Sequence, residues 1–274
     1  MLVVINNLAK CIDHALLKPE ATKQELHQLC VEASEHGFCS VCSDGSRVQD
    51  AVELSKTSSK VKVCAVIGFP LGACGTHIKV AEARDVTSNG ADEIEMVMNI
   101  GKFKDGHSAG DCCHVFQDIK AVVDLAHEKI MLVNVTLETC PLERENEIEN
   151  ACMLCVRAGA DFVKTSTGFD KTRATPEAMA RMKKAVGDKA FAKATGGIQN
   201  HQTAVDFTKA GANRLGCSSS VAIVKGEESP GKQQSPGTHM LGWFFPVALF
   251  QQFLRGPLNL SMTTLSMGLC LAES

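Results

Sequence analysis

The stretch Gly159-Ala160-Asp161-Phe162-Val163-Lys164-Thr165-Ser166 contains the unit that decides the fold of this chain. A glycine that suits the end of a helix is followed at once by a short run of strand-forming residues. The same junction recurs at Gly90-Ala91-Asp92 and at Gly211-Ala212-Asn213. A helix that ends immediately before a strand, repeated along the chain, indicates βα units and a parallel sheet.

Short apolar runs alternate with helical stretches from the N-terminus to about residue 225. Eight parallel strands close into a barrel, and a chain of 274 residues is long enough for one. The predicted fold class is therefore α/β, a single-domain (β/α)8 TIM barrel. The expected strands are 11–16, 38–42, 61–67, 93–98, 130–137, 162–165, 190–194 and 214–217.

A doubly wound open sheet is the rival topology, because it also alternates strands with helices. Such sheets commonly carry a glycine-rich phosphate loop after the first strand. No G-x-G-x-x-G follows the first expected strand, and no G-x-x-x-x-G-K-[ST] occurs in the chain. The barrel is the preferred prediction.

The character of the sequence changes near Gly226. Residues 1–225 are assigned to the barrel, and residues 226–274 to a linker and an atypical apolar C-terminal tail. The linker, 227–237, is rich in polar residues, proline and glycine. The apolar part of the tail, 241–254, is interrupted by Pro246 and is shorter than the ~20 residues that a membrane span needs. A docked or disordered tail is therefore expected rather than a membrane anchor.

Composition favours a small-molecule partner. The formal net charge is -3, with 28 basic and 31 acidic residues and no long basic run, so neither nucleic acid nor a membrane is an expected partner. Thirteen cysteines without a secretory signal pattern favour a reducing, cytoplasmic location. The oligomeric state stays open, with a homo-oligomer among the options.

Two C-x-x-C pairs, Cys39/Cys42 and Cys152/Cys155, are the sequence features that a zinc site could use. The first pair lies in a strand, where positions three apart face opposite ways, and the second lies on one face of a helix. We interpret them as core thiols and expect no metal and no cofactor.

Lysine side chains point into the expected barrel. Alternation along a strand places Phe162, Lys164 and Ser166 on one face, and Phe191 with Lys193 on the same face of the next strand. An ionisable group inside a barrel must be paired or must take part in chemistry. A second ammonium near Lys164 would favour its neutral amine by repulsion, which is the form that attacks a carbonyl to give an imine.

A carboxylate and an amide join these lysines on the inner face. In the strand 93–98 an apolar face suits the helix layer, which leaves Glu95 to point inward and to move protons. In the next strand the same pattern points Asn134 and Glu138 inward. The apolar sets expected to face the helices are Ile94, Met96, Met98, Val133, Val135 and Leu137.

The loops after the seventh and eighth strands suit a phosphate group, since these loops commonly bind phosphate in such barrels. They contain Gly196-Gly197 and Gly216-Cys217-Ser218-Ser219-Ser220. Glycines permit close backbone approach, and hydroxyls can donate hydrogen bonds. A short helix that starts near Ser218 would direct its N-terminal amides at the anion.

With Phe-Val-Lys-Thr-Ser-Thr-Gly around Lys164, Lys-Ala-Thr-Gly-Gly-Ile around Lys193 and the Gly-Cys-Ser-Ser run, the chain closely resembles the deoxyribose-phosphate aldolase family. The resemblance covers residues 11 to about 225 and includes 12–19, 67–72 and 90–94. It implies a metal-free class I aldolase that cleaves 2-deoxy-D-ribose 5-phosphate to acetaldehyde and D-glyceraldehyde 3-phosphate. The implied partner is a small sugar phosphate.

The resemblance also implies residue roles. Lys164 would form the carbinolamine and imine, Lys193 would tune it, and an acid at position 95 would relay protons through water. Cys42 matches a cysteine of the second strand near the site. The residues implied for substrate hydroxyls are Asp13 and Thr167, and those implied for phosphate are Gly168, Gly196, Gly197, Gly216, Ser218 and Ser219.

Two positions depart from the family pattern. The family typically has Asp where this chain has Glu95, and commonly has Lys where it has Asn134. These departures motivate one alternative, a catalytically impaired barrel that acts as an interaction protein. A sugar-phosphate isomerase is a further alternative. Its turnover would survive Lys164→Arg, but it would need a carboxylate base.

Overall fold

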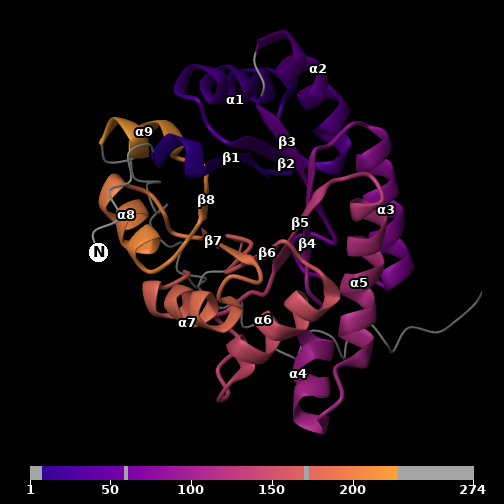
Figure 1. Cartoon of the computed structure of the whole chain (residues 1–274). Coiled ribbons are helices and arrows are strands. Elements are labelled where there is room, and N and C mark those ends of the chain that lie inside the picture. The colour runs from indigo at the N-terminus through magenta and orange to yellow at the C-terminus, as the bar shows by residue number, and fades with distance from the viewer. Residues whose placement is uncertain (1–7, 59–60, 170–172, 227–274) are drawn as a thin grey trace, which may run out of the picture. The chain divides into compact units, whose positions relative to one another are not determined.

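The fold is a closed parallel barrel, described by a computed structural model for residues 8–58, 61–169 and 173–226. Each strand pairs in parallel with the next, and β8 pairs with β1 (Figure 1). The predicted TIM barrel is confirmed, and the open sheet is wrong. The strands are β1 (Ile12–Leu16), β2 (Ser40–Asp44), β3 (Lys62–Ile67), β4 (Glu93–Val97), β5 (Leu132–Thr136), β6 (Phe162–Lys164), β7 (Phe191–Thr195) and β8 (Arg214–Cys217).

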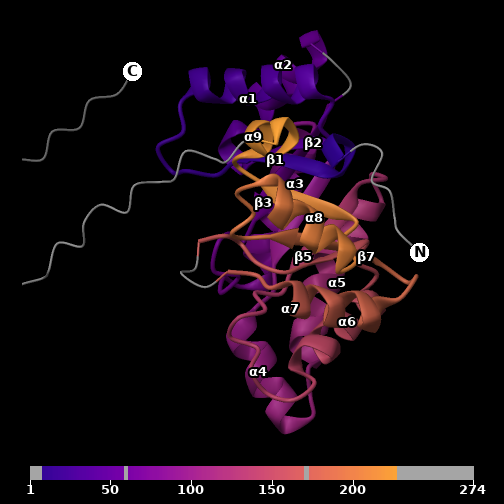
Figure 2. The ribbon, with the colours of Figure 1, turned by 90° about the vertical axis from the view of Figure 1, so that its left-hand side faces the viewer.

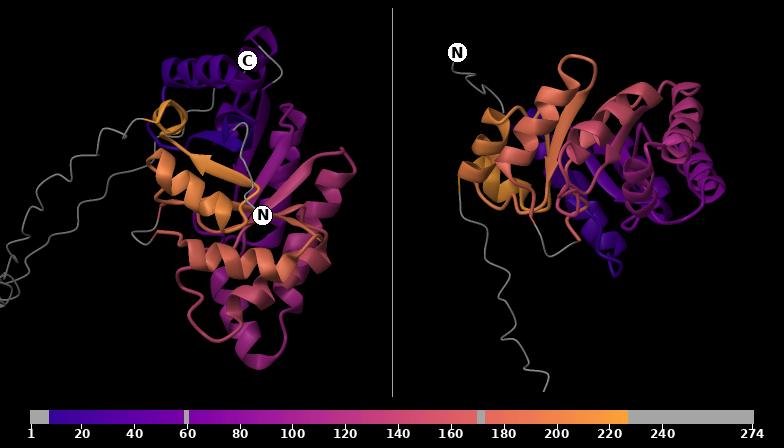
Figure 3. Two further views of the ribbon diagram at one scale, coloured as in Figure 1. Left: turned by 60° about the vertical axis from the view of Figure 1, so that its left-hand side comes forward. Right: turned by 90° about the horizontal axis from the view of Figure 1, so that it is seen from below.

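Helices surround the strands, and the views from the side and from below show this outer layer continuing around the barrel (Figures 2 and 3). Two of them, α4 and α5, follow β4 before the chain returns to β5. The helices are α1 (Lys23–His36), α2 (Val48–Ser58), α3 (Thr76–Ser88), α4 (Ile100–Ala109), α5 (Cys113–His127), α6 (Glu147–Ala158), α7 (Pro176–Val186), α8 (His201–Lys209) and α9 (Ser220–Lys225), with 3-10 turns η1 (Leu8–Cys11) and η2 (Gly45–Arg47).

The three glycine junctions have a common structure. Gly90, Gly159 and Gly211 all adopt positive φ, at 91°, 92° and 108°. This left-handed conformation ends the preceding helix and is accessible to glycine at little cost.

The last residue of each junction locks its strand to the strand before it. The Asp92 carboxylate accepts from the Val63 amide at 2.8 Å, and Asp161 accepts from Val133 at 2.8 Å. The Asn213 side-chain oxygen accepts from the Ala192 amide at 3.0 Å. In all three cases the junction residue also donates its own amide to the carbonyl of the same partner. The repeat therefore ties β4 to β3, β6 to β5 and β8 to β7.

The main apolar core lies between the strands and the helices. The residues predicted to face the helices on β4 and β5 are fully buried in this cluster, which confirms the strand alternation. The opposite faces of the same strands are then free to carry polar groups into the barrel. The confirmed residues are Ile94, Met96, Met98, Val133, Val135 and Leu137.

A buried ion pair connects two helices to the end of β4. The Lys79 ammonium on α3 contacts the Asp118 carboxylate on α5 at 2.6 Å and donates to the Val97 carbonyl at 2.9 Å. Both side chains are buried. Asp118→Ala would leave this ammonium buried without its partner, so we expect the free energy of unfolding to fall by about 3–5 kcal/mol in urea titrations. Asp124→Ala, an exposed site on the same helix, should change it by only about 0.5 kcal/mol or less, and equal effects would contradict the assignment.

The described chain ends at Gly226, directly after α9. This short helix packs against α8 and η1, and it buries Ile223 in the core. The predicted linker and apolar tail lie outside the described residues and stay predictions. Among the described helices, none is both long and apolar enough to cross a membrane.

Candidate active site

Lys164 lies at the end of β6 with its side chain inside the barrel, where only 2% of the residue is exposed. Its Nζ donates a short hydrogen bond to Glu95 Oε1, which comes from β4 on the other side of β5. The predicted inward orientation brings these two residues into direct contact.

Lys193 shares the same carboxylate. Its Nζ lies 3.0 Å from Glu95 Oε2 and 2.7 Å from Asp13 Oδ2, which comes from β1. The strand register pairs Lys193 with Lys164. Glu95 therefore bridges the two ammonium groups, and the predicted repulsion between them is moderated by a carboxylate that both of them contact. Activation of Lys164 by this repulsion stays a prediction.

The neighbouring charges determine the protonation states of Glu95 and Lys193. Burial opposes the charged form of Glu95, but the ammonium groups of Lys164 and Lys193 outweigh it and lower the pKa of this carboxyl to about 2. Burial also opposes the charged form of Lys193, but Asp13 and Glu95 outweigh it and raise its pKa well above the ordinary value. Near neutral pH Glu95 is thus a carboxylate and Lys193 an ammonium.

This coupling predicts a stability loss in acid. The pKa of Glu95 is lower in the folded protein, about 2, than its ordinary value of 4.5, so its stabilisation is complete above pH 4.5 and disappears as the pH falls toward 2. We expect the free energy of unfolding to lose roughly 3 kcal/mol over this window through Glu95 alone. Urea titrations at several pH values should show a shallower loss in Glu95→Gln, and parallel curves for the two proteins would contradict the coupling.

The interior charges continue toward the amino ends of the strands, in a part of the charge network that strand alternation did not predict. Arg214 on β8 holds Glu93 with two hydrogen bonds, of 2.6 and 3.0 Å, and lies 3.5 Å from Asp13 Oδ1. Its guanidinium also stacks 4.9 Å above the ring of Phe162. Arg214 begins the predicted strand 214–217, but its acidic partners lie on β1 and β4, far away in the sequence. Arg214 approaches Asp13 Oδ1, whereas Lys193 contacts Asp13 Oδ2.

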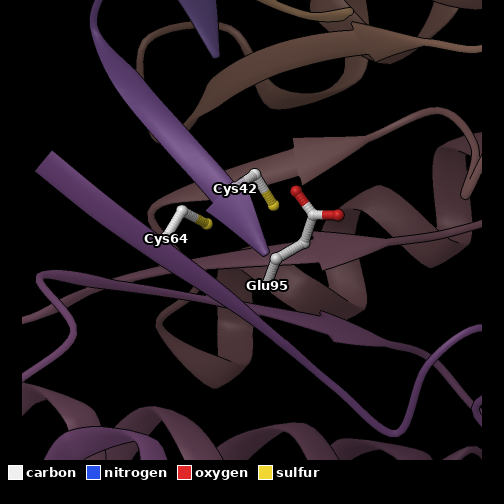
Figure 4. Close-up of side chains that lie close together, drawn as sticks. All are labelled: Cys42, Cys64 and Glu95. Atoms are coloured by element: carbon white, nitrogen blue, oxygen red, sulfur yellow. The ribbon is translucent and has the colours of Figure 1, made fainter. Parts of the chain in front are cut away.

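Cys42 lies beside the bridge, as the resemblance implied. Its Sγ, the Sγ of Cys64 and a carboxylate oxygen of Glu95 lie within 4.8 Å of one another (Figure 4). The predicted core thiols Cys152 and Cys155 are buried on α6, where burial raises the pKa of Cys152 to about 12. The two C-x-x-C pairs thus have different environments, and Cys42 is grouped with Cys64 rather than with Cys39.

Thr167 follows β6 and is held by Glu138, which strand alternation had pointed into the barrel. Its amide and hydroxyl both donate to Glu138 Oε2, at 3.0 and 2.8 Å. Glu138 adopts φ of 54°, an unusual conformation for a residue with a side chain. The φ of Glu138 could not be predicted from strand alternation.

The predicted phosphate residues lie at the same end of the barrel as Lys164. Gly216 is within β8, and the others are in the segments that follow β6, β7 and β8. Gly168, Gly196 and Gly197 adopt positive φ of 85°, 100° and 82°. Gly216 permits close packing of β8 on β7, since a Cβ there would lie 2.3 Å from Thr195 Oγ1. Ser218 is exposed and Ser219 immediately precedes α9, so this helix begins at Ser220, close to the predicted start near Ser218.

Comparison with known proteins decides the family. The sequence profile described as "DeoC/LacD family aldolase" matches residues 8–225. This chain belongs to the DeoC/LacD aldolase family. It is 51% identical over 221 residues to the deoxyribose-phosphate aldolase of Thermococcus gammatolerans, which covers 80% of this chain and 96% of that protein. The corresponding protein of Geobacillus sp. is 49% identical over 81% of this chain and 96% of its own length.

Solved structures agree with membership of the DeoC/LacD aldolases. A putative deoxyribose-phosphate aldolase from Coccidioides immitis has a TM-score of 0.74 and 39% identity, covering 80% of this chain and 85% of that one. The enzyme of Aeropyrum pernix, described as a unique tetrameric structure, has a TM-score of 0.73 and 32% identity over 80% and 89% of the two chains.

Proposed function

We propose that this chain is a class I aldolase that cleaves 2-deoxy-D-ribose 5-phosphate to acetaldehyde and D-glyceraldehyde 3-phosphate. The observation that carries the proposal is the buried amine of Lys164, hydrogen-bonded to a carboxylate that also pairs with Lys193. A buried lysine beside a proton acceptor has what an imine-forming nucleophile needs. The relatives named deoxyribose-phosphate aldolase support the same substrate.

In the proposed reaction the Lys164 amine attacks the C1 aldehyde of the open-chain sugar to give a carbinolamine. Loss of water then gives a protonated imine. Removal of the C3 hydroxyl proton breaks the C2–C3 bond, and its electron pair moves into the imine to form an enamine. Glyceraldehyde 3-phosphate leaves, and protonation and hydrolysis of the enamine release acetaldehyde. Glu95, which touches both lysines, is the group we propose to accept and return protons at the amine.

Glu95 stands where the family typically has aspartate, and the longer side chain changes how the carboxylate reaches the two lysines. With one methylene more than aspartate, Glu95 reaches both ammonium groups directly. A direct contact replaces the relay through water that the family resemblance implies. Asn134, beside it in the register, is buried and donates to the Ile94 carbonyl at 3.5 Å. We propose that Lys193, paired with Asp13, supplies the cation that the site lacks at position 134.

We propose binding roles for the remaining residues at this end of the barrel. Asp13 and Thr167 would bind substrate hydroxyls. The Thr167 hydroxyl donates to Glu138 and accepts from the Phe169 amide, which leaves its second lone pair for a substrate hydroxyl. Cys42 would line the site next to Glu95. The phosphate would be bound by Gly168, Gly196, Gly197, Gly216, Ser218 and Ser219.

We also propose a cytoplasmic location and self-association for this aldolase. The twelve cysteines of the described residues are free thiols, which suits a reducing compartment. The tetrameric relative from Aeropyrum pernix supports testing for a homo-oligomer by light scattering of the purified chain.

A coupled assay for glyceraldehyde 3-phosphate, with deoxyribose 5-phosphate as substrate, tests the proposed reaction. We expect wild type to release product and Lys164→Arg to release none. Release of glyceraldehyde 3-phosphate that survives Lys164→Arg would exclude Lys164 as the nucleophile. An isomerase would instead convert a sugar phosphate without releasing glyceraldehyde 3-phosphate from deoxyribose 5-phosphate. A folded wild type without turnover would favour an impaired barrel, which neither the described structure nor the comparisons support at present.

A further inference from the structure

Two thiols and a carboxylate meet inside the barrel on three successive strands. Cys42 of β2 and Cys64 of β3 are direct partners in the strand register, and Glu95 comes from β4. Their ligand atoms lie within 4.8 Å of one another, and all three residues are buried. In Figure 4 the Cys42 thiol points toward the Glu95 carboxylate, with the Cys64 sulfur beside it. The proposed reaction has no use for Cys64.

The donor set suits a thiophilic divalent cation. Zinc binds thiolate sulfur at about 2.3 Å and carboxylate oxygen at about 2.0–2.2 Å, so ligand atoms around one ion lie roughly 3.5–4 Å apart. Atoms already within 4.8 Å need to move only slightly to reach these distances. Thiolate ligands select soft cations, whereas Mg²⁺ and Ca²⁺ prefer oxygen ligands.

Binding of the cation can also leave the net charge of the barrel interior unchanged. A divalent cation that displaces the protons of both thiols leaves the net charge of the interior unchanged, despite the nearby ammonium groups of Lys164 and Lys193. The charged groups that face the cluster are Glu95, these two lysines and Asp13. The neighbouring Cys42 and burial raise the pKa of Cys64 well above its ordinary value, so this thiol is protonated and must lose its proton when it binds a cation.

We propose that Cys42, Cys64 and Glu95 form an inhibitory binding site for a thiophilic divalent cation of the zinc and cadmium type. The bound cation draws the Glu95 carboxylate away from Lys164 and Lys193 and so removes the group that bridges the two amines. Lys164 Nζ is hydrogen-bonded to Glu95, so a group that reaches this amine also comes close to the carboxylate. The inhibition rests on the proposed aldolase function, whereas the binding of the cation does not.

Titration of the full-length chain with Cd²⁺ tests the site, with ultraviolet thiolate-to-metal absorption as the first readout and product release as the second. Wild type should bind Cd²⁺ through two thiolates and lose turnover, and excess Mg²⁺ should not compete. Cys64→Ala should weaken binding and inhibition by at least the roughly 10–100-fold that losing even an outer-shell partner costs. Cys64→Ser, closer in volume, provides a second variant if Cys64→Ala folds poorly.

The matched control is Cys152→Ala, because Cys152 is another buried thiol but lies in the core on α6. It should titrate as wild type does, with each variant's turnover normalised to its own value without Cd²⁺. Equal titrations of wild type, Cys64→Ala and Cys152→Ala would overturn the site. Cd²⁺ that binds through Cys64 without lowering turnover would overturn the inhibition. A chain without aldolase activity would still report the site by absorption, so the two proposals can fail separately.

Discussion

Replacing Lys164 by arginine is expected to lower turnover on the order of 10⁴-fold or more, because the nucleophile is lost while a cation that can donate to Glu95 remains. Borohydride reduction in the presence of acetaldehyde should attach one ethyl group to wild type, and peptide mass analysis should locate it on Lys164. The arginine variant should incorporate none.

Lys120→Arg is the matched control for this experiment. Lys120 is half-exposed on α5 and pairs with Asp124 at 2.7 Å, a contact that arginine can keep. The control should retain both turnover and the reduced adduct. Adduct found on another lysine in a folded Lys164→Arg protein would refute the assignment of the nucleophile.

Glu95→Gln is expected to lower turnover by about 10²–10⁴-fold, the range typical of removing a general acid or base. The glutamine keeps the length of the side chain but cannot accept the Lys164 proton. Glu95→Asp retains the carboxylate but shortens its reach to the two ammonium groups, and we expect a loss of up to about 100-fold, as for a misplacement near 1 Å. Steady-state assays of both variants measure the two effects.

Two other results would contradict the proposed role of Glu95. Turnover that rises in Glu95→Asp, or in Asn134→Lys, would mean that the native site is impaired relative to its family and that the direct bridge is a defect. A Glu95→Gln variant as active as wild type would remove Glu95 from proton transfer and leave it only the role of holding Lys164 and Lys193 in place.

Strand alternation predicted much of this site. The alternation of apolar and polar residues placed Lys164, Lys193 and Glu95 on one inner face, and the structure brings their charged groups into contact. The glycine junctions likewise predicted the ends of helices before β4, β6 and β8. Both are local signals, set by the period of a strand and by the conformational freedom of glycine.

The remaining features depend on contacts between residues far apart in the sequence. The pairing of Lys193 with Asp13 joins β7 to β1, and that of Arg214 with Glu93 joins β8 to β4. These contacts arise from the closure and shear of the barrel, which no single segment encodes. The role of Glu138 was missed for a different reason, since its backbone departs from the strand geometry on which alternation relies.

The junctions at Asp92, Asp161 and Asn213 have a consequence for the order in which the protein can assemble. Each ties a strand to the one made just before it, so strand pairs β3–β4, β5–β6 and β7–β8 can form in turn as the chain leaves the ribosome. The contacts of Lys193 and Arg214 with Asp13 instead connect the last pair back to the first strand. The charge network around Lys164 is therefore complete only when the last strand pair has been synthesised and docked, and nascent chains cannot gain activity gradually.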